Sequence, residues 1–137
     1  MSLPIPSGVR IVVADNSPLM REGLTVLLER HSDLHVVGWA CNGHEAVAVC
    51  RREKPDIVLM DLRMPAMDGI AATRILHSEL PQTGIIILTF DEHTEMLESA
   101  HKAGGRGYLL KDSARKEVVN AVRVVHAGGY YFPPPTA

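Results

Sequence analysis

Five polar residues of this 137-residue chain have types that suit phosphoryl chemistry, and each lies at the end of an apolar run. They are Asp15, Asn16, Asp61, Thr89 and Lys111. Carboxylate and amide oxygens are ligands that Mg²⁺ accepts, and an ammonium group and a hydroxyl can bind phosphoryl oxygens. These groups can act together only if the apolar runs end at one edge of a common structure.

Short β-branched apolar runs alternate five times with helical patterns, which is typical of a parallel sheet with helices on both faces. The expected strands are residues 9–15, 34–40, 57–60, 85–88 and 107–110. The third and fourth runs are apolar throughout, which is typical of central strands buried on both faces. The expected helices begin at Pro18 after the capping residue Ser17, at Asn42 in a capping box with Glu45, and near residues 69, 92 and 113. The last four are expected to end near residues 52, 80, 103 and 127.

This alternation predicts an α/β fold, a flavodoxin-like doubly wound sheet of five parallel strands in the order 2-1-3-4-5 with five helices. Asp15 and Asp61 then face each other at the carboxyl ends of neighbouring strands. Two carboxylates held that close repel, so one takes up a proton unless a cation is present. An oxygen-rich cluster open to water suits Mg²⁺, which would keep Asp61 ionised as a nucleophile for an acyl phosphate. Lys111 and Thr89 would contact the phosphoryl oxygens.

The amino-acid composition limits the classes of protein to which this chain can belong. Hydrophobic residues make up 46% and charged residues 22%, with a net charge of −2, which fits a globular domain and argues against nucleic-acid binding by this segment. No apolar run approaches the ~20 residues of a membrane span, and the start does not resemble a secretory signal. We therefore expect a cytoplasmic protein without membrane contact. Cys41, His44 and Cys50 are unevenly spaced for a zinc site, so small buried or half-buried cysteines are the favoured interpretation.

Four segments resemble the receiver domains of bacterial two-component response regulators. They are Val-Val-Ala-Asp-Asn-Ser-Pro-Leu-Met-Arg-Glu-Gly-Leu (12–24), Val-Leu-Met-Asp-Leu-Arg-Met-Pro-Ala-Met-Asp-Gly (58–69), Ile-Leu-Thr (87–89) and Gly-Tyr-Leu-Leu-Lys-Asp (107–112). The first and last of these, with Ala-Gly-Gly-Tyr-Tyr (127–131), resemble the subgroup whose output half is a LuxR-type helix-turn-helix. The resemblance covers about residues 9–132.

The resemblance implies a role for each matching residue. Asp61 matches the phospho-acceptor, Thr89 and Lys111 the phosphate-contacting pair, and Tyr108 the aromatic residue that changes rotamer with Thr89. The metal site would comprise Asp15, Asn16, Asp61 and the backbone carbonyl of Arg63. Pro65 and Gly69 match structural residues of the loop after the acceptor. For Tyr108 the alternative is an edge-strand tyrosine with a half-buried ring.

The resemblance also implies partners. A sensor histidine kinase would supply the phosphoryl group, and phosphorylation would reshape the face of the last two helices and last strand and favour a homodimer. DNA would be contacted only through an output domain outside this chain. We divide the chain into an N-terminal extension (1–8), a receiver domain (9–129) and the start of a linker (130–137). Apart from accepting and slowly losing its own phosphoryl group, the domain is not expected to be an enzyme.

Two positions depart from the family pattern. Asn16 stands where most members have a second acid, which predicts weaker Mg²⁺ binding, and Phe90 stands where a small residue is common. Asn16 motivates one alternative, a degenerate receiver that acts by protein contact without phosphorylation. A second alternative is a true enzyme, either a hydrolase with an aspartyl-phosphate intermediate or a nucleotide binder. Against it, Arg63 replaces the second aspartate of haloacid-dehalogenase-type hydrolases, and no glycine-rich nucleotide motif is found.

Overall fold

The computed structural model describes residues 8–91 and 93–132. Five parallel strands form one sheet in the order β2-β1-β3-β4-β5, so the predicted flavodoxin-like topology is confirmed. The strands are β1 (Val9–Ala14), β2 (Leu34–Ala40), β3 (Ile57–Asp61), β4 (Gly84–Thr89) and β5 (Gly107–Leu110). The helices are α1 (Pro18–Glu29), α2 (Gly43–Glu53), α3 (Gly69–Glu79), α4 (Thr94–Ala103) and α5 (Ala114–His126). None of these helices has the length and apolar character of a membrane span.

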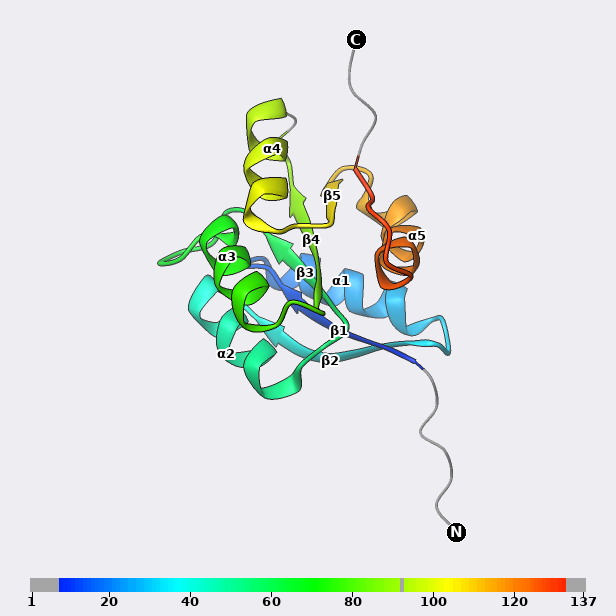
Figure 1. Cartoon of the computed structure of the whole chain (residues 1–137). Helices are drawn as coiled ribbons and strands as arrows, with labels where there is room; N and C mark the ends of the chain where they lie inside the picture. Colours follow the sequence, from blue (N-terminus) through cyan, green and yellow to red (C-terminus); the bar gives the residue numbers. More distant parts are fainter. Residues whose placement is uncertain (1–7, 92, 133–137) are drawn as a thin grey trace.

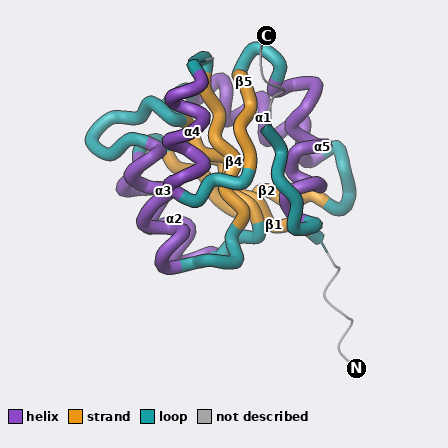
Figure 2. The backbone as a smooth tube through the Cα atoms, turned by 45° about the horizontal axis from the view of Figure 1, so that its top comes forward, coloured by secondary structure: helices purple, strands orange, loops and turns teal. Residues whose placement is uncertain are grey.

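The helices cover both faces of the sheet, with α2, α3 and α4 on one face and α1 and α5 on the other (Figure 1). Figure 2 shows the strands enclosed between the two helical layers. Alternate strand residues point to opposite faces, so Val12 and Val58 pack towards α2–α4, whereas Ile11 and Leu59 pack towards α1 and α5. Every residue of β3 and β4 is buried, as predicted from their uninterrupted apolar runs.

The predicted helix caps are largely confirmed. The Ser17 hydroxyl accepts from the backbone N–H of Met20, and Pro18 follows as the first helical residue. Asn42 accepts from the N–H of Glu45 at 2.8 Å. The Glu45 carboxylate, however, accepts from Cys41 at 3.0 Å, so the return bond of the capping box forms one residue earlier than expected.

The fourth helix begins at Thr94, two residues after the predicted start. The reason lies in the preceding turn, where the Asp91 carboxylate accepts from the backbone N–H of His93 at 2.8 Å and holds that residue in an extended conformation. Glu92, the predicted first residue, lies outside the described residues, as do residues 1–7 and the prolines at 133–135.

The loop between β3 and α3 is tightly packed against the end of β3. A Cβ atom at Gly69 would lie 2.3 Å from the carbonyl oxygen of Asp61, so this position admits only glycine without a backbone shift. Within the loop, Ala66 has a positive φ of 69° and Met67 donates its N–H to the Pro65 carbonyl at 2.8 Å. This is a strained three-residue turn. The loop therefore approaches the carboxyl end of β3 closely.

Candidate functional site

The carboxyl edge of the sheet brings the predicted charged residues together. Asp15 directly follows β1 and Asp61 is the last residue of β3, the neighbouring strand. The Nζ atom of Lys111, which follows β5, lies 2.8 Å from Asp15 Oδ2 and 3.2 Å from Asp61 Oδ1. The predicted proximity of the two carboxylates and Lys111 is therefore present in the structure.

Backbone groups orient both carboxylates. The N–H of Ser17 donates to Asp15 Oδ1 at 2.8 Å, and the N–H of Arg63 donates to Asp61 Oδ1 at 3.3 Å. The guanidinium of Arg21 on α1 donates to the backbone carbonyl of Asp15 and fixes the turn after β1. The sequence had suggested no role for Arg21, although it lies within the Arg-Glu-Gly-Leu segment.

The two carboxylates are buried, since Asp15 is 0% and Asp61 3% exposed, and among the described residues Lys111 is the cation that forms ion pairs with them. Burial raises the pKa of Asp61, and the Asp15 carboxylate raises it further, while Lys111 and the N–H of Arg63 oppose the shift. Asp61 Oδ2 is buried and accepts no hydrogen bond from any described residue. Asp15 Oδ2 is also buried, and its contact is the ion pair with Lys111 at 2.8 Å. The cluster therefore contains a carboxylate oxygen that accepts no hydrogen bond, and its two carboxylates exceed its one ammonium group in charge.

This arrangement fits a hard divalent cation. Oxygen ligands, excess negative charge and an opening to solvent are the features that Mg²⁺ requires. Asn16 is exposed and lines the same hollow as Asp61 and Arg63. Across residues 8–91 and 93–132, no three His, Cys, Asp or Glu side chains gather as a metal-binding group. A cation here would thus have two acids, Asp15 and Asp61, and otherwise neutral oxygens.

Thr89 and Tyr108 are connected through the backbone of one loop residue. The Thr89 hydroxyl accepts from the N–H of Asp91 at 3.0 Å, and the Tyr108 hydroxyl donates to the Asp91 carbonyl at 2.8 Å. Tyr108 lies on the edge strand β5, but it is only 2% exposed, so its ring is more deeply buried than the half-buried ring of the alternative. Burial, with the nearby charge of Asp91, raises the pKa of Tyr108 to about 12.

Phe90 lines the same hollow as Asp61 and Lys111. Its side chain is 65% exposed, and the Lys111 ammonium lies 5.5 Å from the centre of its ring. At this distance the ring attracts the cation. Phe90 therefore lies against the ammonium group of Lys111, a relation that the sequence alone did not suggest.

Asp91 is a second site residue that the sequence reasoning missed. Its carboxylate accepts from the N–H of His93 and lies 2.7 Å from the His93 ring and 3.7 Å from the Arg63 guanidinium. The hydrogen bonds from the backbone and ring of His93 lower the pKa of Asp91. The sequence does show an acid two residues after Thr89, but the position of its side chain depends on the conformation of the loop, which the sequence does not reveal.

The cysteines do not form a site. Cys41 Sγ lies 3.4 Å from a carboxylate oxygen of Glu45, and Cys50 is buried in the core, where burial raises the pKa of its thiol to about 12. These contacts favour the structural interpretation of both cysteines.

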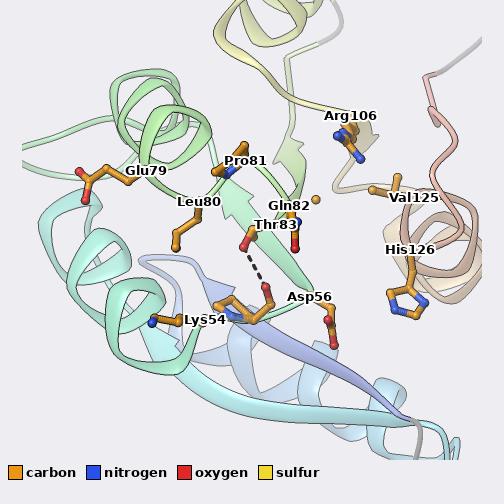
Figure 3. Close-up of a pocket in the computed structure, with 12 residues that line it drawn as sticks. Lys54, Asp56, Glu79, Leu80, Pro81, Gln82, Thr83, Arg106, Val125 and His126 are labelled. Atoms are coloured by element: carbon orange, nitrogen blue, oxygen red, sulfur yellow. Dashed lines mark hydrogen bonds between the residues drawn. The ribbon is translucent and has the colours of Figure 1, made fainter.

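A second hollow lies at the opposite, amino-terminal edge of the sheet (Figure 3). Lys54, Asp56, Arg106 and His126 are among the residues that line it. The Thr83 hydroxyl donates to the carbonyl of Pro55 at 2.8 Å, the bond that Figure 3 marks with a dashed line. None of the residues with predicted chemistry lies here.

Comparison with known proteins identifies the family. Residues 11–123 match the response regulator receiver domain. The transcriptional regulatory protein LnrK of Bacillus subtilis is 39% identical over 126 residues, which are 92% of this chain and 57% of LnrK. The chain therefore spans little more than half the length of this relative.

Two solved structures agree with this assignment. A LuxR-family two-component response regulator from Aurantimonas sp. SI85-9A1 superposes with a TM-score of 0.89 at 36% identity, over 93% of this chain and 91% of that one. The signal receiver domain of NarL from Mycobacterium tuberculosis gives a TM-score of 0.86 at 36% identity, over 90% and 99%. The family is one of signalling receivers rather than classical enzymes. This chain belongs to the response regulator receiver domains, and its relatives are transcriptional regulators of the LuxR/NarL type.

Proposed function

We propose that Asp61 accepts a phosphoryl group from the phosphohistidine of a sensor histidine kinase. The observation that carries the proposal is the buried pair of Asp15 and Asp61 with the Lys111 ammonium between them. In the transfer, Asp61 Oδ2 attacks phosphorus and the P–N bond of the donor breaks. The electron pair of that bond stays on the imidazole of the kinase, and an acyl phosphate forms on Asp61.

The residues around Asp61 support this chemistry. Asp15, Asp61, the Asn16 amide oxygen and the Arg63 carbonyl would hold Mg²⁺. When bound, the cation supplies positive charge for the carboxylates and the phosphoryl oxygens. Lys111 supplies a further positive charge, because its ammonium already lies within 3.2 Å of Asp61 Oδ1. The transition state of phosphoryl transfer needs little more than such positioning and charge.

The bonds of Thr89 suggest how the site changes the rest of the domain. In the structure its hydroxyl accepts from the Asp91 N–H, and movement of the hydroxyl to donate to a phosphoryl oxygen on Asp61 would break this bond. The loop that holds the Tyr108 hydroxyl is then free to rearrange. The phosphoryl group thus acts as a local charge that shifts the population of two conformations.

The relatives suggest the output. Since LnrK is a transcriptional regulatory protein and this chain spans 57% of its length, we infer that the domain controls a DNA-binding output domain outside residues 1–137. The inferred protein is cytoplasmic, forms a homodimer on phosphorylation and contacts DNA only through that output domain. Residues 130–137 would begin the linker to it.

Phosphorylation followed by intact mass measurement tests the proposal. Incubation with a small acyl-phosphate donor and Mg²⁺ should add one phosphoryl group to the wild-type chain and none to Asp61→Ala. Omission of Mg²⁺ should slow the reaction strongly. If the wild type acquires no adduct, the degenerate receiver that Asn16 motivates, which works by protein contact alone, becomes the better description.

A further inference from the structure

Residues 130–132, which we call the strap, lie along the outer edge of β5. Tyr131 donates its N–H to the carbonyl of Arg106 at 2.9 Å, and Tyr108 donates its N–H to the carbonyl of Tyr131 at 2.9 Å. These two bonds make a parallel bridge between Gly107 and Tyr131. In Figure 1 the strap, drawn in red, runs back beside β5. The strap therefore extends the sheet by one short rung beyond its last strand.

One side chain of the strap binds α5. The Tyr131 hydroxyl donates to Glu117 Oε1 at 2.7 Å, and this bond lowers the pKa of Glu117. The Tyr131 ring packs against the apolar cluster between the sheet, α1 and α5. A hydrogen bond to a carboxylate is stronger than one between neutral groups, so Tyr131 is firmly held.

The neighbouring side chains of the strap bind α4, on the opposite face of the sheet. The rings of Tyr130 and Phe132 lie 5.8 Å and 5.3 Å from the ring of His101. Phe132 also packs against the apolar cluster that contains Tyr108. The strap thus contacts α4, β5 and α5 together, and a shift of any one of these elements changes the contacts that hold the strap.

A series of hydrogen bonds, joined through the residues Asp91, Tyr108 and Tyr131, connects the strap with Thr89. Thr89 accepts from the Asp91 N–H at 3.0 Å, and the Asp91 carbonyl accepts from the Tyr108 hydroxyl at 2.8 Å. The N–H of Tyr108 donates to the strap at 2.9 Å, and the strap ends the series at Glu117 at 2.7 Å. Tyr108 is the central member, because its side chain holds the loop while its backbone holds the strap.

We propose that the strap is the segment through which the state of Thr89 is passed to the part of the protein that follows. Docking of the strap on β5 and the contact of Tyr108 with Asp91 stabilise each other. Such coupling is reciprocal, so a change at Thr89 loosens the strap, and loss of the strap loosens the loop at Asp91. The inference rests on the proposed function only in that a phosphoryl group on Asp61 is what moves Thr89.

Amide hydrogen exchange on the unphosphorylated full chain tests the coupling directly. Tyr131→Ala should speed exchange of the Asp91 amide about tenfold, the effect expected when one supporting hydrogen bond is lost. In the other direction, Tyr108→Phe should speed exchange of the Tyr131 amide. Val36→Ala, in the half-buried side of the distant strand β2, is the control for a general loss of stability.

Two outcomes would overturn the inference. One is an Asp91 amide that exchanges no faster in Tyr131→Ala than in Val36→Ala, which would leave the strap as simple packing. The second outcome concerns the wild type after treatment with a phosphodonor and Mg²⁺, with intact mass measured on the same sample. A phosphoryl adduct together with an unchanged exchange rate of the Tyr131 amide would also overturn the inference. A missing adduct counts against the proposed function alone, and the comparison of the unphosphorylated variants then decides the coupling.

Discussion

The two edges of the sheet differ in how their polar groups are satisfied. At the amino-terminal edge, Asp56 accepts from the N–H of Arg10 at 2.9 Å, and the Thr83 hydroxyl donates to Pro55 at 2.8 Å. At the carboxyl edge, Asp61 Oδ2 is buried and accepts no hydrogen bond from the described residues. One edge is built for stability, whereas the other keeps an incompletely paired carboxylate.

This difference indicates where the domain gives up stability for chemistry. A buried carboxylate without full pairing costs free energy, and proteins retain such groups mainly at functional sites. At the amino-terminal edge, the Asp56 carboxylate and the Thr83 hydroxyl are both hydrogen-bonded to the backbone. Removal of the buried charge of Asp61 should therefore raise the free energy of unfolding, whereas removal of a hydrogen-bonded group at the amino-terminal edge should lower it.

The largest effect is expected where the backbone of the site is most crowded. Gly69→Ala should lower the free energy of unfolding by about 3 kcal/mol, because its Cβ would lie 2.3 Å from the Asp61 carbonyl oxygen. The matched control is Gly128→Ala at the far end of α5, where φ is +98° and nothing lies within 4 Å of the added Cβ. It should cost only about 1 kcal/mol. Urea unfolding measures both, and equal costs would contradict the crowding at Asp61.

Asp61→Asn should raise the free energy of unfolding by about 2 kcal/mol at pH 7 without Mg²⁺, since it removes an incompletely paired buried charge. Because the folded state raises the pKa of Asp61, the wild type is penalised only as the pH rises above the carboxyl's ordinary value of 3.8. The gain should therefore be small near pH 4 and grow towards neutrality.

The control for this prediction is the cation itself. Mg²⁺ should stabilise the wild type by binding the folded state and should stabilise Asp61→Asn much less. Thermal unfolding with and without Mg²⁺ measures the difference. A less stable Asp61→Asn at pH 7 would mean that Lys111 already satisfies the pair.

Much of the fold and of the site followed from the sequence because both depend on local patterns. The apolar runs predicted which strands are central, and polar residues at strand ends had to meet once the strand order was known. This is why Asp15, Asp61 and Lys111 are found together as expected.

The remaining features depend on contacts that form only in the folded chain. The role of Asp91 depends on the turn that its own carboxylate makes with His93, so α4 begins later than predicted. The pairing of Tyr131 with β5 requires an edge strand that a sequence pattern does not display. Glycines and prolines indicated only a chain segment after α5, and its use as a linker stays a prediction.

The carboxyl edge of the sheet can be given one more negative charge at position 16. Asn16→Asp should tighten Mg²⁺ binding about tenfold, because one additional negative charge near a divalent cation is worth more than 1 kcal/mol at a partly exposed site. Isothermal titration calorimetry of the two proteins measures this directly. Equal affinities would show that Asn16, although it lines the same hollow as Asp61, lies outside the metal's reach.

The smallest effect is expected at the amino-terminal edge. Thr83→Val keeps the shape of the side chain but removes the hydroxyl that donates to Pro55, and this should lower the free energy of unfolding by about 1 kcal/mol. Because this edge has no part in the proposed chemistry, the rate of Asp61 phosphorylation should stay at the wild-type value. Urea unfolding and intact mass after phosphodonor treatment give the two quantities. A slower phosphorylation in Thr83→Val would show that the two edges are coupled, and the division between a stabilising edge and a reactive edge would then be wrong.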